Sequence, residues 1–116
     1  MTNQHLLIHA YGLDPEQLLA TTLRVTRNAH TQLGTRARLH LVVQGPAVKL
    51  LTLGSVHRTE IEEILALPEV EILACENSMS SANITDSDLL TGIQTVPSAV
   101  AYLAEKQWEG WAYVRF

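Results

Sequence analysis

The chain has 116 residues, the length of one domain, and we expect a single domain over residues 1–116. Its 47% hydrophobic and 17% charged residues exclude a disordered chain, and its single cysteine excludes an internal disulfide. Eight Lys and Arg against twelve Asp and Glu give a formal charge of −4, which argues against a nucleic-acid binder because phosphate contacts need a basic surface.

We expect a cytoplasmic protein that does not enter a membrane. The first residues, Met1 to Gln4, contain neither a basic region nor a small-residue cleavage site, so no signal peptide is expected. The apolar runs are far shorter than the roughly 20 residues that span a bilayer.

The first predicted elements are a strand over residues 5–10 (HLLIHA) and a long helix. Asp14, Pro15 and Gln17 form a helix start signal, because Asp accepts from free amides and Pro suits the first helical position. Gly34 ends this helix. Its apolar stripe consists of Leu18, Val25, Ala29 and Leu33, flanked by Leu19 and Leu23.

A second strand is predicted over residues 39–44 (LHLVVQ), and a short helix from Gly45-Pro46 through residue 53. Thr59 and Glu62 have the spacing of a capping box for a helix that stops before Pro68. The third strand covers Val70–Cys75 (VEILAC).

The segment over residues 77–91 is rich in Ser, Thr, Asn and Asp. Two interpretations are open: a hydrogen-bonding rim over a small pocket, or a solvated crossover with a short turn capped by Thr85 and Asp88.

Two short strands, over residues 93–96 and 111–115, flank a helix that begins near Pro97 and ends at Gly110. The apolar face of this helix is expected to contain Val100, Leu103, Ala104 and Trp108, with Tyr102, Glu105 and Lys106 pointing away. Gln107 lies on the same apolar face, so we expect its buried amide to bind the backbone of a neighbouring loop.

Strands therefore alternate with helices, and the strands are almost continuously apolar. This pattern predicts an α/β fold in which a parallel sheet is covered by helices on both faces, similar to flavodoxin in general architecture.

Cys75 is the main candidate for chemistry, because it ends a predicted strand just before a helical turn. Ligands bind at the carboxyl ends of strands in open α/β sheets, and a helix N-terminus favours the reactive thiolate. Glu76 would raise the thiol pKa if its side chain pointed inward. The alternative is that Cys75 is a small buried hydrophobic residue.

The five histidines lack the spacing of a metal site, so we expect no metal. His9 would approach Cys75 if their strands were neighbours, and it is therefore a candidate helper. We also expect no cofactor: phosphate-binding motifs are absent, and Pro15 removes an amide from the turn that flavin mononucleotide would need.

Four segments resemble the DsrE/DsrF-like family in order along the chain: VVQGPAV (42–48), CENSM (75–79), VPSAV (96–100) and QWEGWAYVR (107–115). The resemblance implies a three-layer α/β/α sandwich with a parallel five-stranded sheet, and assembly into homotrimers or hexamers. It also implies a sulfur-relay function, in which Cys75 matches the persulfide-carrying cysteine of the family.

Our leading hypothesis is a sulfur-relay protein in which Cys75 accepts persulfide sulfur and passes it on, with a small sulfur-carrier protein as a candidate partner. Asn77, Ser78, Gly45 and His9 are the candidates for supporting the thiolate and its pocket. A non-catalytic module that binds a small molecule or anion, or serves in assembly, is the rival. A homo-oligomer is also expected from the two Trp and three Tyr, several of them near the C-terminus.

Overall fold

Five parallel strands form the centre of the computed structural model, which describes residues 4–116. Their order across the sheet is β4-β3-β2-β1-β5. The strands are β1 (Gln4–Ala10), β2 (Ala37–Val43), β3 (Val70–Cys75), β4 (Gln94–Val96) and β5 (Ala112–Arg115). The expectation about a signal peptide rests partly on residues 1–3, which lie outside the described residues.

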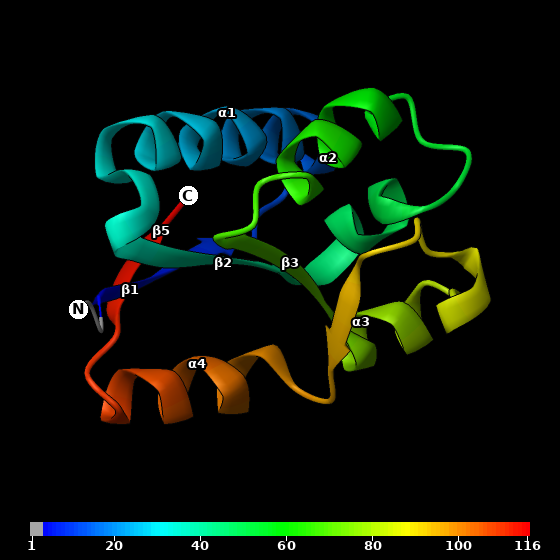
Figure 1. Cartoon of the computed structure of the whole chain (residues 1–116). Helices are drawn as coiled ribbons and strands as arrows, with labels where there is room; N and C mark the ends of the chain where they lie inside the picture. The colour runs from blue at the N-terminus through cyan, green and yellow to red at the C-terminus, as the bar shows by residue number, and fades with distance from the viewer. Residues whose placement is uncertain (1–3) are drawn as a thin grey trace.

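Helices cover both faces of this sheet, which confirms the predicted three-layer α/β/α fold. Figure 1 shows α1 (Pro15–Leu33) and α2 (Arg58–Leu65) on one face and α4 (Ala99–Trp108) on the other. A short helix, α3 (Glu76–Ser81), continues directly from β3. Three 3-10 helices complete the fold within residues 4–116: η1 (Gly34–Arg36), η2 (Gly45–Leu51) and η3 (Asp86–Asp88). No helix within the described residues is long and apolar enough to cross a membrane.

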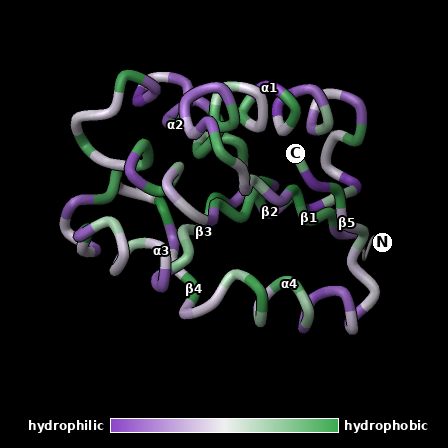
Figure 2. The backbone as a smooth tube through the Cα atoms, turned by 180° about the vertical axis from the view of Figure 1, so that it is seen from behind, coloured by the Kyte–Doolittle hydropathy of each residue, from purple (hydrophilic) through white to green (hydrophobic). Residues whose placement is uncertain are grey.

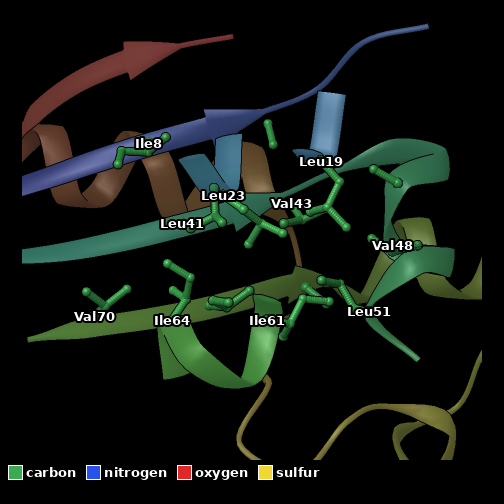
Figure 3. Close-up of a cluster of buried hydrophobic side chains, with 14 of the residues drawn as sticks. Ile8, Leu19, Leu23, Leu41, Val43, Val48, Leu51, Ile61, Ile64 and Val70 are labelled. Atoms are coloured by element: carbon green, nitrogen blue, oxygen red, sulfur yellow. The ribbon is translucent and has the colours of Figure 1, made fainter. Parts of the chain in front are cut away.

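The sheet separates two hydrophobic clusters, and its central strands are mainly hydrophobic (Figure 2). The larger cluster packs strand residues such as Ile8 and Leu41 against α1 and α2 (Figure 3). The smaller cluster lies between the sheet and α4, and consists of Leu7, Val42, Leu73, Cys75, Val96, Ala99 and Leu103. Cys75 is therefore part of the core on the α4 face.

The start signal of α1 is confirmed, because the Asp14 carboxylate accepts the Gln17 N–H at 3.3 Å. The buried stripe of α1 differs from the predicted one and includes Thr22 and Thr26. Both threonine hydroxyls donate to carbonyls one turn earlier in the same helix, so they are buried without losing their hydrogen bonds. The predicted stripe of Leu18, Val25, Ala29 and Leu33 is only partly buried.

Two predicted helix boundaries are wrong. The capping box of Thr59 and Glu62 is absent, because α2 begins after His57 with no side-chain cap, and Glu62 instead pairs with Arg58 at 3.1 Å. The short helix after β2 is a 3-10 helix that ends at Leu51 rather than at residue 53. The capping box of Thr85 and Asp88 is confirmed, so the polar segment after β3 contains a capped turn.

The predicted face of α4 is wrong in part: Leu103 is buried and Glu105 is exposed, as expected, but other positions differ. Val100 and Trp108 are 65% and 82% exposed, whereas Tyr102 packs on the sheet with its hydroxyl bound to Nδ1 of His40. Gln107 is exposed, and its amide donates to the Leu103 carbonyl of its own helix at 3.2 Å. The Tyr102 ring can pack on the sheet because its hydroxyl forms a hydrogen bond there.

Candidate functional site

The carboxyl ends of β1, β2 and β3 lie along the same edge of the sheet, because the strands are parallel and in register. Cys75 ends β3 and is the N-cap residue of α3. The first residues after β2 are Gln44 and Gly45, and Tyr11 follows β1. This edge therefore brings together side chains from three loops, as open α/β sheets commonly do at their binding sites.

The sulfur of Cys75 lies at the start of two helices. Its Sγ accepts a hydrogen bond from the backbone N–H of Ala99, the first residue of α4, at 3.4 Å. The residue is only 2% exposed, with Leu73, Val96 and Leu103 in the same cluster. A polar hydrogen-bonding environment on one side and hydrocarbon on the other thus enclose the thiol.

Opposing effects act on the pKa of the Cys75 thiol. Burial raises this pKa, whereas hydrogen bonds from the Ser78 hydroxyl and from the backbone amides of Ser78, Ala99 and Asn77 lower it. The hydrogen bonds prevail, and the net pKa is below the ordinary value for cysteine. Because the thiolate is the nucleophilic form, these donors increase the reactive fraction at neutral pH.

Ser78 connects the thiol to the loop after β2. The Gly45 N–H donates to Ser78 Oγ at 2.7 Å, which orients the serine hydroxyl so that its own hydrogen is available to the sulfur. Gly45 has φ +78°, and a Cβ at this position would lie 2.9 Å from Cε1 of Tyr11. Glycine is therefore required here both for the turn and for the approach of the Tyr11 ring.

A pocket of about 260 Å³ opens next to Ser78. Cys75 does not line it, but its hydrogen-bond partner Ser78 does. The lining residues are Tyr11, Gln44, Gly45, Pro46, Lys49, Ser78, Ser81 and Ala82. A molecule in this pocket would therefore be separated from the sulfur by the Ser78 side chain.

The strand order does not support His9 as a direct helper of Cys75, because β2 lies between β1 and β3. His9 instead binds Tyr113 and Gln44: its Nδ1 lies 2.7 Å from the Tyr113 hydroxyl and its Nε2 lies 2.8 Å from Gln44 Oε1. Burial lowers the pKa of His9, and the charge of Arg115 lowers it further, against the hydrogen bond to Gln44. The imidazole is accordingly neutral at pH 7.

The side chains of Glu76 and Asn77, the two residues after Cys75, do not bind the thiol. The carboxylate of Glu76 accepts from the Thr95 hydroxyl at 2.7 Å and is thus held toward β4. Asn77 is exposed, and it acts on the thiol through its backbone N–H.

The structure places Cys75, Ser78, Asn77 and Gly45 close together, but sequence reasoning did not include the Ala99 amide or most of the pocket. Gln44 and Tyr11 each follow a predicted strand, so the rule that ligands bind at strand carboxyl ends could have found them. Lys49 had no comparable signal. Within residues 4–116, no three His, Cys, Asp or Glu side chains are grouped so that they could hold a metal ion.

Comparison with known proteins decides the family. The family model described as "DsrE/DsrF-like family" matches residues 16–116. The chain belongs to the DsrE/DsrF-like family. A search of curated proteins found no match.

Three solved structures are similar to this DsrE/DsrF-like chain. The protein of unknown function MTH1491 from Methanobacterium thermoautotrophicum is 26% identical, with a TM-score of 0.86 over 98% of this chain and 100% of its own. The YchN protein from E. coli is 18% identical, with a TM-score of 0.75 and full coverage of both chains. The conserved protein of unknown function BT1422 from Bacteroides thetaiotaomicron is 20% identical, with a TM-score of 0.75 over 98% of this chain and 96% of its own. The last two likenesses establish the fold alone.

Proposed function

We propose that this protein carries sulfane sulfur on Cys75. The observation that supports the proposal most directly is the set of hydrogen bonds on the sulfur, from Ser78 and from the amides of Asn77 and Ala99, which lower the thiol pKa. A sulfur carrier needs one nucleophilic sulfur and no second cysteine nearby to release the bound sulfur by forming a disulfide. The chain has a single cysteine.

The transfer is a thiol exchange. The Cys75 thiolate attacks the terminal sulfur of a persulfide donor, the donor S–S bond breaks, and its electron pair leaves on the donor thiolate. The persulfide on Cys75 then gives its outer sulfur to an acceptor thiolate, and Cys75 leaves as the thiolate. Cys75 is 2% exposed, and we propose that the donor approaches the sulfur from the pocket that Ser78 lines.

A passive cysteine beside a ligand-binding pocket is the second candidate function. It is favoured by the burial of Cys75 and by the neighbouring pocket of about 260 Å³. In this alternative the protein binds a small molecule or anion, and the thiol takes no part in chemistry.

After incubation with inorganic polysulfide, we expect the intact mass of the folded protein to increase by one sulfur atom. The thiolate attacks a terminal sulfur of the polysulfide, which leaves shortened by one atom. Intact-mass spectrometry measures the adduct, and Cys75→Ser is expected to form none. An unmodified wild type, or an equal adduct on Cys75→Ser, would contradict the sulfur-carrier proposal and favour the passive cysteine.

The pH dependence of the Cys75 alkylation rate tests whether Ser78 lowers the pKa of the thiol. We expect a midpoint below the reference cysteine pKa of about 8.5, and a higher midpoint in Ser78→Ala, which removes a donor to the sulfur. Ser81→Ala is the control, because Ser81 lines the same pocket but donates to the Asn77 carbonyl. Equal midpoints in all three proteins would refute the role of Ser78.

We further propose that the protein is a homo-oligomer, a trimer or hexamer, acting in the cytoplasm with a small sulfur-carrier protein as a partner. Support for self-association comes from Trp108, Val100 and Phe116, which are large, apolar and exposed, and from the exposed edge strand β5. Sedimentation equilibrium at micromolar concentration is expected to give a multiple of the chain mass. A monomer mass under these conditions would refute self-association.

A further inference from the structure

A chain of hydrogen bonds determines which end of the Gln44 amide is available to the pocket. Gln44 Oε1 can only accept, so His9 Nε2, which lies 2.8 Å away, carries the hydrogen. In the neutral ring Nδ1 then accepts, and the hydroxyl of Tyr113 donates to it. Because Oε1 accepts a hydrogen bond from His9, the group of Gln44 that remains to bind a ligand in the pocket is its NH2, which is a donor.

A charged donor also lines the pocket, together with the hydroxyls of Ser78 and Ser81, whose hydrogens are engaged with Cys75 Sγ and the Asn77 carbonyl. Lys49 offers an ammonium group, and none of the lining residues is acidic. Tyr11, which forms one wall, lies under the guanidinium of Arg115, whose carbon is 5.7 Å from the ring centroid. Arg115 also donates to the Tyr11 carbonyl at 3.2 Å, so its positive charge is held at this wall. The pocket therefore combines positive charge with hydrogen-bond donors.

We propose that this pocket binds the sulfonyl oxygens of a small thiosulfonate anion, with Tyr113 and His9 acting as positioning residues that present the Gln44 amide to it. The inference rests on the proposed function, and it names the class of sulfur donor. Sulfonyl oxygens only accept hydrogen bonds, which matches the two donors of the pocket, the NH2 group of Gln44 and the ammonium group of Lys49.

The reaction balances without an external oxidant or reductant. The Cys75 thiolate attacks the outer sulfur of R–SO2–S⁻, and a new S–S bond forms on Cys75. The bond between the outer sulfur and the sulfonyl sulfur breaks, and its electron pair leaves with the sulfinate R–SO2⁻. Positive charge at the pocket stabilises this departing anion.

The test separates binding from sulfur transfer by using methanesulfonate, which has no sulfur to give, and the Cys75→Ser variant. We expect titration to shift the amide NMR signals of Gly45 and Ser78 in both wild type and Cys75→Ser, and ethylammonium, a cation of similar size, to shift neither. Lys49→Gln and Gln44→Glu are expected to weaken binding at least tenfold. The first removes a positive charge, and the second replaces an amide donor with a negative charge. Arg24→Gln, an exposed site on α1, is the charge control and should bind as wild type does.

The role of His9 has its own readout. Nitrogen-15 NMR of the imidazole is expected to show the hydrogen on Nε2 of wild-type His9, and His9→Phe is expected to bind methanesulfonate about tenfold more weakly, as loss of an oriented hydrogen bond to a charged group would do. A hydrogen on Nδ1 alone would overturn the positioning role, whether or not His9→Phe folds. Absence of methanesulfonate binding would overturn the ligand class while leaving the polysulfide result on Cys75 intact. Conversely, binding without any polysulfide adduct would refute sulfur carriage alone.

Discussion

Replacement of Leu41 by alanine is expected to lower the free energy of unfolding by about 2–5 kcal/mol. Leu41 lies in β2, with β1 and β3 on its two sides, and its side chain is fully buried in the cluster that faces α1 and α2. Removal of three carbon atoms leaves a cavity that the neighbouring strands, held by hydrogen bonds, cannot close. Chemical denaturation measures the change.

Leu13→Ala is the matched control for this substitution. Leu13 is 102% exposed, so the same chemical change removes no buried contact. We expect its effect to stay within about 0.5 kcal/mol. Similar losses of stability in Leu41→Ala and Leu13→Ala would contradict the assignment of the core.

Replacement of Gly45 by alanine is expected to destabilise the protein by about 2 kcal/mol, since the positive φ alone costs about 1–2 kcal/mol. The added Cβ would lie 2.9 Å and 3.0 Å from two carbons of the Tyr11 ring, so the ring must also move. The variant should therefore distort the pocket and disturb the Gly45–Ser78 hydrogen bond. Thermal unfolding and the amide NMR signal of Ser78 measure the two effects.

Gly110→Ala isolates the part of this loss that comes from the pocket. Gly110 also has a positive φ, of +96°, but nothing lies within 4 Å of an added Cβ. It should therefore cost the backbone strain alone and leave the Ser78 signal unchanged. If the two glycine variants behaved alike in both measurements, the contact with Tyr11 would have no structural importance.

The three central strands, β1, β2 and β3, were predictable from sequence because they are largely buried and therefore mainly apolar. Val70–Cys75 was predicted at its observed bounds, and the α/β/α fold followed from the alternation of strands and helices. The order of the strands did not follow, since each pairing depends on contacts between distant parts of the chain. His9 illustrates the consequence: its role as a helper of Cys75 required β1 and β3 to be neighbours.

The face of α4 could not be read from hydrophobicity because this helix has two apolar sides. Ala99 and Leu103 are on the buried side, whereas Val100 and Trp108 are on the exposed side. Two contacts determine which side faces the sheet: the hydrogen bond between Tyr102 and His40, and the hydrogen bond from the Ala99 N–H to Cys75 Sγ. Cys75 was identified as the candidate thiol from its position at the end of β3. Its hydrogen-bond donor, the Ala99 N–H, was not identified, because this required knowing which face of α4 meets the sheet.

The pairing of the first strand with the last has a consequence for how the chain folds. Leu6 is opposite Ala112 and His9 is opposite Arg115, so contacts between β1 and β5 close a loop of more than a hundred residues. During translation, one edge of β1 must stay unpaired until β5 has emerged from the ribosome. We therefore expect the nascent chain to expose an aggregation-prone strand edge for most of its synthesis, and docking of β5 to be a late, slow event.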